Sequence, residues 1–124
     1  MAIIIGDIHG NVDKVKAFLG YKPDDLHVAL GDYLDSFREP ADRQVNCLQM
    51  LLNSKAVLLW GNHDLHYLKN PPFVCTGYQY KHEQQYRDLI EANKERFKAA
   101  YVADGWLCTH AGVHFRLARA EQVN

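Results

Sequence analysis

Short polar motifs follow four apolar runs of this chain, and they hold side chains that can bind metal ions and move protons. The motifs read Gly6-Asp7-Ile8-His9, Gly31-Asp32-Tyr33-Leu34-Asp35, Gly61-Asn62-His63-Asp64 and His110-Ala111-Gly112. Carboxylates, an amide oxygen and imidazoles form a mixed set of oxygen and nitrogen ligands, which suits divalent Mn, Fe or Zn better than a soft metal ion. Histidine also titrates near neutral pH, so it is the side chain best suited to proton transfer.

The segments between these motifs alternate between strand and helix. Short runs rich in Val, Ile and Leu predict strands buried on both faces, and longer segments with apolar residues at helical spacing predict helices. We expect strands at 2–6, 26–31, 56–60, 100–103 and 106–109, helices at 11–20, 40–53, 64–69 and 81–98, and a loop at 70–80. This alternation predicts an α/β fold with βαβ units and a largely parallel sheet. Residues past the carboxyl ends of parallel strands gather along one edge, where ligands bind, so the motifs predict one site.

The segment from Tyr67 to residue 98 supports two further expectations. Helix 81–98 carries a single apolar stripe and is otherwise mostly charged, which is typical of a surface helix. The stripe consists of Tyr86, Leu89, Ile90 and Phe97. The aromatic loop 70–80, together with Tyr67, could form a lid over a substrate or pack on this helix, and we expect packing.

The composition is that of an ordinary globular protein. With 124 residues and 48% apolar content, the chain has the size of one domain or part of one, and residues 1–124 are treated as a single domain. A net charge of −1 gives no signal for nucleic acid, and no apolar run approaches the roughly 20 residues that span a bilayer. No basic segment precedes the first strand, so no signal peptide is expected. The odd, widely spaced Cys47, Cys75 and Cys108 favour buried free thiols in a reducing cytoplasmic setting.

The residue types suggest different roles for individual side chains of the site. A carboxylate can bridge two metal ions, and Asp32 is the candidate because it lies between the other motifs along the chain. Two cations about 3.5–4 Å apart can activate a hydroxide and polarise a phosphoryl oxygen. His63, beside a candidate metal ligand, could then give a proton to the leaving oxygen while Asp35 holds its ring.

Taken together, the four motifs resemble those of the calcineurin-like metallophosphoesterase superfamily. They look most like the branch of phosphoprotein phosphatases and bacterial diadenosine tetraphosphatases, whose motifs read GDIHG, GDxVDRG, GNHE/D and HAG, and the resemblance covers residues 3–114. It implies two divalent cations as cofactors, with Mn favoured over Fe or Zn. The implied metal ligands are Asp7 and His9 for the first metal, Asp32 as the bridge, and Asn62 and His110 for the second. It also implies that His63 is the proton donor and Asp35 its partner.

Two departures from the family pattern affect phosphate binding. The second motif continues as Asp35-Ser36-Phe37, where the family usually has Asp-Arg-Gly, and Trp60 stands where phosphoprotein phosphatases usually have Arg. Arginine makes bidentate contacts with phosphate that serine cannot make. Arg38 is the nearest replacement, and we predict that it binds substrate. Weak phosphate affinity, or a substrate unlike a phosphoprotein, follows as a hypothesis.

The carboxyl end lacks a motif that family members normally have, which supplies a further His ligand to the second metal. Only residues 111–124 follow His110. The chain therefore resembles a family member that is truncated at its carboxyl end and keeps the amino-terminal portion of the four-layer α/β sandwich. The exposed sheet edge of such a fragment could pair with another copy, so a homodimer is a further hypothesis.

The remaining histidines are expected to lie outside the site. His66 follows His63 at helical spacing, but we expect it to face solvent. His27 and His82 are expected to be surface or strand-start residues. His114 is expected at the surface rather than as a replacement metal ligand.

The expected function is hydrolysis of a phosphoester by a metal-activated hydroxide. The substrate stays open among phosphorylated small molecules, nucleotides and phosphoproteins. One alternative is a nucleotide phosphodiesterase or dinucleoside polyphosphate hydrolase. Another is a truncated, weakly active or inactive domain that still binds metal or that acts only as an interaction module.

Overall fold

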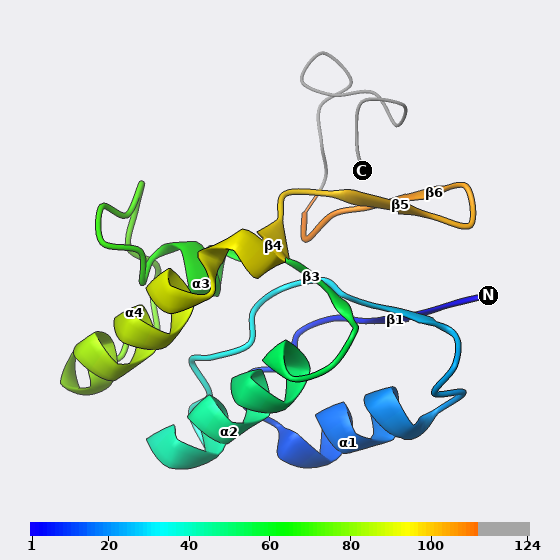
Figure 1. Cartoon of the computed structure of the whole chain (residues 1–124). Helices are drawn as coiled ribbons and strands as arrows, with labels where there is room; N and C mark the ends of the chain where they lie inside the picture. The colour runs from blue at the N-terminus through cyan, green and yellow to red at the C-terminus, as the bar shows by residue number, and fades with distance from the viewer. Residues whose placement is uncertain (112–124) are drawn as a thin grey trace.

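A parallel four-stranded sheet forms the centre of the molecule, for which a computed structural model describes residues 1–111. Its strands lie in chain order: β1 (Ala2–Ile5), β2 (Leu26–Ala29), β3 (Val57–Leu59) and β4 (Phe97–Lys98). The helices α1 (Val12–Gly20) and α2 (Ala41–Leu52) connect the first three strands and cover one face of the sheet (Figure 1). The α/β class and the parallel sheet are therefore confirmed.

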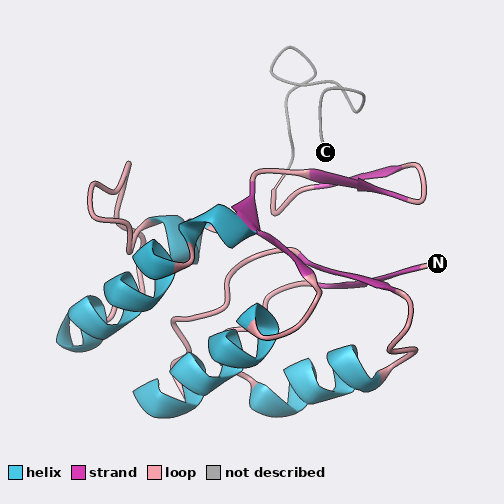
Figure 2. Cartoon of the chain, in the orientation of Figure 1, coloured by secondary structure: helices cyan, strands magenta, loops and turns pink. Residues whose placement is uncertain are grey.

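A two-stranded antiparallel hairpin covers the opposite face of the sheet. It consists of β5 (Tyr101–Ala103) and β6 (Trp106–Cys108), with Tyr101 opposite Cys108. Figure 2 shows it on the side of the sheet away from α1 and α2. The buried Ala103 and Cys108 pack against Val28 and Leu59 of the sheet. The predicted strands at 100–103 and 106–109 are thus present, but they form a separate sheet.

Burial explains why the inner residues of the central strands are apolar. Val28 and Ala29 of β2 and Leu58 and Leu59 of β3 have no exposed surface, because helices pack on one face and the hairpin on the other. β1 is at the edge of the sheet, and its Ile4 is 46% exposed. The strand register, with Ile4 opposite Val28 and Leu58 opposite Phe97, brings the carboxyl ends of these strands to one edge.

The first two helices lie close to their predicted positions. Asn11 caps α1 by accepting a hydrogen bond from the Lys14 backbone N–H at 3.0 Å. Pro40 precedes α2, whose buried face includes Cys47 and Leu48. Both helices turn these apolar faces toward the principal core under the sheet.

The predicted helix at 81–98 is wrong at its carboxyl end, after residue 92. A short 3₁₀ helix η1 (Tyr80–His82) leads into α4 (Glu83–Ala92), and a second one, η2 (Lys94–Arg96), leads into β4. Phe97 belongs to the strand because it pairs with Leu58 and stacks on the Trp60 ring, with ring centroids 4.5 Å apart. Strand pairing therefore overrides the helical periodicity there.

The short helix predicted at 64–69 is displaced as well. In the structure it is α3 (Asn62–Leu65), which begins directly after Gly61. The Asp64 side chain accepts a hydrogen bond from the Gly61 N–H at 2.9 Å, which starts the helix within the motif itself. The predicted metal ligand Asn62 and proton donor His63 are therefore held on the first turn of a helix.

The aromatic residues before α4 pack inward. Tyr67 is fully buried, stacks on Tyr78 with ring centroids 4.6 Å apart, and meets Tyr86 of α4 edge-on at 5.2 Å. Packing on the helix is therefore confirmed for these rings, although Phe73 and Tyr80 remain exposed.

One of the histidine predictions needs correction. His66 is completely buried rather than exposed to solvent. His27 lies at the start of β2, as one of the predicted alternatives has it, and is buried, with ring nitrogens 2.8 Å and 2.9 Å from the carbonyl oxygens of Asp25 and Tyr21. His82 is half-buried, and His114 lies outside the described residues.

The three cysteines are free thiols, of which Cys47 and Cys108 are buried and Cys75 is half-buried. Burial raises the pKa of Cys47 to about 12. Among residues 1–111, none of the helices combines the length and the apolar character needed to cross a bilayer.

Candidate active site

Two of the predicted metal ligands flank one oxygen of Asp32, and a third contacts one of them. The Nε2 atoms of His9 and His110 lie 3.7 Å and 3.3 Å from Asp32 Oδ2. The Oδ1 atom of Asn62 lies 2.9 Å from His110 Nε2. Asp7, which is exposed, has a carboxylate oxygen within 4.8 Å of ligand atoms of His9 and Asp32. The structure therefore brings all five predicted ligands to one place, at the carboxyl edge of the sheet.

Backbone carbonyls determine which nitrogen of His9 and His110 faces Asp32. His9 Nδ1 lies 2.7 Å from the carbonyl oxygen of Leu34, and His110 Nδ1 lies 2.8 Å from that of Leu30. A carbonyl accepts a hydrogen bond, so the proton of each neutral ring is on Nδ1 and the lone pair is on Nε2. Histidines that bind metal ions are usually oriented in this way.

Asp32 and Asn62 present their oxygens in a manner that fits a cation. Asp32 Oδ1 accepts the His63 N–H at 3.0 Å, which leaves Oδ2 between the two imidazoles. The Asn62 amide donates from Nδ2 to Cys75 Sγ at 3.4 Å, so its oxygen turns to His110. Without a cation, the Asn62 oxygen and the His110 lone pair repel each other. Two ligand atoms about 2.1 Å from one ion, at right angles, lie about 3 Å apart, so the donor set fits a metal ion.

The backbone around the site adopts conformations that are rare for residues with side chains. Asp7, His9, Asp32 and Asp35 have φ angles of 49°, 43°, 60° and 66°. Such angles cost free energy, and they persist where surrounding contacts impose them. Here the His9 N–H donates to the Asp32 carbonyl at 2.9 Å, which ties the first motif to the second.

The second and third motifs touch backbone to backbone. Gly31 has a φ angle of 105°, and a Cβ atom placed on it would lie 2.5 Å from the Gly61 nitrogen. A Cβ atom on Gly61 would lie 2.3 Å from Asp32 Oδ1. Both positions therefore require glycine, which explains why these two motifs begin with it.

Asp64 is a buried acid that joins these two motifs. Its carboxylate accepts the N–H groups of Asp32 at 2.7 Å, Tyr33 at 3.0 Å and Gly61 at 2.9 Å. Burial raises the pKa of Asp64 to about 7, and the three donors oppose that rise. Sequence reasoning assigned Asp64 no role, although an acid three residues after a helix-starting glycine is a capping signal.

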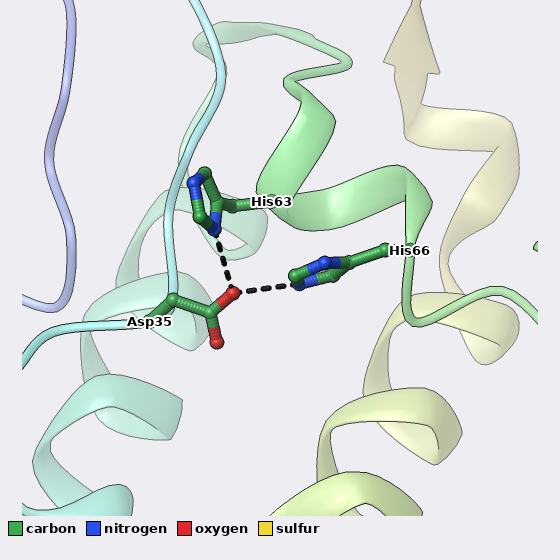
Figure 3. Close-up of side chains that lie close together, drawn as sticks. All are labelled: Asp35, His63 and His66. Atoms are coloured by element: carbon green, nitrogen blue, oxygen red, sulfur yellow. Dashed lines mark hydrogen bonds and ion pairs between the residues drawn. The ribbon is translucent and has the colours of Figure 1, made fainter. Parts of the chain in front are cut away.

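The predicted pair of His63 and Asp35 is in contact. His63 Nδ1 lies 2.8 Å from Asp35 Oδ2, and Asp35 is 3% exposed. Two further residues, which sequence reasoning did not include in the site, reach the same carboxylate. His66 Nε2 lies 2.6 Å from Asp35 Oδ2, and the Tyr67 hydroxyl donates to Oδ1 (Figure 3). The three-residue spacing between His63 and His66 was the available signal for this cluster.

A cavity of about 430 Å³ opens beside the proposed proton donor. It is lined by His9, Asp35, Ser36, Phe37, Arg38, His63 and Thr76. The predicted substrate-binding residue Arg38 therefore borders this cavity. A larger cavity of about 520 Å³ lies around His27 and Lys55 at the opposite end of the strands. Both ring nitrogens of His27 already contact carbonyl oxygens, so this histidine is not available to a substrate. The smaller cavity, beside His63, is therefore the better substrate site.

The fold and these motifs are those of the metallophosphoesterase superfamily, and sequence comparison agrees. Residues 2–124 match the calcineurin-like phosphoesterase family, and the chain belongs to this family. A Caenorhabditis elegans protein named "Putative serine/threonine-protein phosphatase C27B7.6" is 29% identical over 125 aligned residues, covering 90% of this chain and 26% of the relative. The chain thus spans about a quarter of that relative's length.

Proposed function

We propose that this chain is a metal-dependent phosphoesterase that acts on phosphomonoesters with two divalent cations. The observation that carries the proposal is the position of Asp32 Oδ2, which lies 3.7 Å and 3.3 Å from the Nε2 atoms of two histidines whose Nδ1 atoms face backbone carbonyls. One carboxylate oxygen flanked by two such nitrogens is suited to bridging two cations. Family membership supports the reaction class.

The proposed ligands divide into two sets that share Asp32. Asp7 and His9 hold the first cation together with Asp32, and Asn62 and His110 hold the second. Manganese is our first choice, and iron or zinc would suit the same ligands. When bound, the cations polarise the phosphoryl oxygens and lower the pKa of a water to roughly 7.

The protein's own groups bind the ester and supply the proton. His63, held at Nδ1 by Asp35, lines the cavity beside His9 and gives a proton from Nε2 to the leaving oxygen. The Arg38 guanidinium makes no hydrogen bond or ion pair with other residues in 1–111, so it is free to bind phosphate oxygens. Arg38 thereby binds phosphate in place of the arginine of the family's Asp-Arg-Gly motif, which this chain lacks.

The rim of the cavity supports a second candidate, a nucleotide phosphodiesterase or dinucleoside polyphosphate hydrolase. Phe37 is 90% exposed and borders the cavity, and its ring lies close to Gly77, as does that of His63. An exposed aromatic ring beside the proton donor can stack on a nucleobase. Hydrolysis of a nucleotide diester faster than a simple monoester would favour this candidate.

The test is hydrolysis of p-nitrophenyl phosphate and bis(p-nitrophenyl) phosphate with added Mn²⁺. We expect Asp32→Asn to lower kcat at least about a hundredfold with both esters. We expect a loss of that size from His63→Ala with an alkyl phosphate, whose leaving alkoxide needs a proton, and a smaller one with the p-nitrophenyl esters. His82→Ala, at a half-buried histidine on η1, is the matched control and should keep full activity. Activity that survives both site substitutions would refute the mechanism.

Metal analysis separates an enzyme from an inactive metal-binding domain. Two Mn²⁺ per chain with turnover supports the enzyme. One or no bound ion, with no turnover of either ester, supports the inactive domain. The predicted homodimer and cytoplasmic location remain predictions.

A further inference from the structure

We propose that His66 is a positioning residue that holds the Asp35 carboxylate in place for His63. This inference rests on the proposed function, because it assigns His66 a part in delivering the proton. His66 lies directly after α3 and is completely buried. A buried imidazole needs partners for its polar nitrogens, and those partners define what this ring does.

The proton on the neutral His66 ring can be placed from its neighbours. The backbone N–H of Cys75 donates to His66 Nδ1 at 3.1 Å. A ring nitrogen that accepts a hydrogen bond carries no proton, so the proton of the neutral ring is on Nε2. Nε2 lies 2.6 Å from Asp35 Oδ2, and this N–H therefore points its positive charge at the carboxylate.

Asp35 Oδ2 is the acceptor toward which this N–H points. Nε2 lies 2.6 Å from Asp35 Oδ2, but it makes no regular hydrogen bond within residues 1–111. Leaving a buried donor without a partner is unfavourable, so the ring relies on its attraction to Asp35. The same attraction opposes rotation of the Asp35 carboxylate.

The Asp35 carboxylate is thus held from three directions. Oδ2 accepts from His63 Nδ1 at 2.8 Å and faces His66, while Oδ1 accepts from the Tyr67 hydroxyl. The Tyr67 oxygen in turn accepts the Gln79 N–H at 2.8 Å. Figure 3 shows the two imidazoles converging on one carboxylate oxygen. Turning the carboxylate away from His63 would also break the contacts with His66 and Tyr67.

The same neighbours argue against a third metal site at this cluster. Asp35, His63 and His66 have ligand atoms close enough to hold an ion. A neutral histidine that binds metal through Nε2 must carry its proton on Nδ1. In His66 that proton would face the Cys75 N–H, so two donors would collide. In this tautomer His66 directs an N–H toward Asp35 and is not a metal ligand.

Two substitutions separate the two contacts of the ring. His66→Gln can place an amide N–H near the Nε2 position and keep the contact with Asp35. His66→Asn can place its amide oxygen near the Nδ1 position and keep only the contact with Cys75. We expect His66→Asn to lower kcat about 10- to 100-fold with KM unchanged, and His66→Gln to retain most of the activity.

A dependence on the leaving group distinguishes positioning from a structural role. p-Nitrophenolate leaves readily without a proton, whereas an alkoxide needs one. The loss in His66→Asn should therefore be larger with an alkyl phosphate than with p-nitrophenyl phosphate. It should also vanish when His63 is already replaced by Ala. Equal losses for both variants and both substrates, adding fully to the His63→Ala loss, would overturn the proposal.

A spectroscopic measurement keeps the inference independent of activity. Long-range ¹H–¹⁵N spectra of the metal-free wild-type protein report which nitrogen of His66 carries the proton. We expect the Nε2–H form, and the Nδ1–H form would overturn the proposal even in an active enzyme. If the wild type hydrolyses neither ester, the proposed function fails, while an Nε2–H ring still supports the contact with Asp35.

Discussion

The site has two sides, one with the proposed metal ligands His9 and His110 and the other with His63 and His66 around Asp35. The histidines of the two sides differ in the group that faces their Nδ1 atoms. His9 and His110 have a backbone carbonyl there, so each neutral ring presents a lone pair at Nε2. His66 has a backbone N–H there, and its neutral ring presents a proton at Nε2. His63 has a carboxylate at Nδ1, and a ring held in this way can carry a second proton on Nε2 and give it away. Neighbouring groups therefore sort four similar side chains into proposed metal ligands and proton-handling residues.

The largest expected effect tests this division directly. We expect His110→Asn and His63→Asn each to lower kcat about 10²- to 10⁴-fold. Only His110→Asn should also lower the bound Mn²⁺, by about one ion per chain. Activity assays combined with metal analysis check both expectations. Loss of metal from His63→Asn to the same extent would abolish the distinction between the two sides.

A smaller effect, which should disturb both sides of the site, is expected at the backbone contact between the second and third motifs. Gly31→Ala would place a Cβ atom 2.5 Å from the Gly61 nitrogen at a φ of 105°. We expect a destabilisation of about 2–4 kcal/mol, measured by urea unfolding of the metal-free protein. Gly20→Ala is the control, because a Cβ atom there meets nothing within 4 Å. Equal stability of the two variants would contradict the close packing of these motifs.

Asp64 should affect stability more moderately. In Asp64→Asn one acceptor becomes an amide donor, which would face either the Tyr33 N–H or the N–H groups of Asp32 and Gly61. Leaving buried donors unpaired costs about 1–3 kcal/mol. Asp24→Asn, at an exposed position, should change the free energy of unfolding by less than about 0.5 kcal/mol. A neutral effect of Asp64→Asn in the same urea titrations would argue against its joining role.

Cys75 is expected to give the smallest effect and the most informative one, since it contacts both sides. Its thiol accepts from Asn62, while its backbone N–H donates to His66. Cys75→Ala removes the first contact and keeps the second. We therefore expect Mn²⁺ affinity to fall a few-fold, equivalent to about 1 kcal/mol, with kcat unchanged at saturating metal. A lower kcat under those conditions would show that the two sides are not separable at this residue.

Local patterns predicted much of this site because its residues directly follow apolar strands. The positions of Asp7, His9, Asp32 and Asn62 follow from where each run ends. The burial of His66 could not be predicted in the same way. It depends on the backbone of Cys75, nine residues away, and on Asp35, which lies in another motif.

The error at the end of the predicted helix 81–98 has a similar cause. Phe97 fits a helical stripe, but in the structure it extends the sheet beside β3 and packs on Trp60. The pairing partner of a strand lies far away in the chain, so the sequence of the strand segment alone does not indicate the pairing. The role of Asp64 was missed because its three donors belong to two different motifs.

His110 contacts a residue far away in the sequence, and this affects the order in which the site is assembled during folding. The contact between His9 and the Leu34 carbonyl closes a loop of 25 residues, whereas that between His110 and the Leu30 carbonyl closes one of 80. Closing the longer loop costs about 1 kcal/mol more in chain entropy. The ligands proposed for the first cation can therefore come together before those proposed for the second. Loading of the second cation would then report that the β5–β6 hairpin has docked.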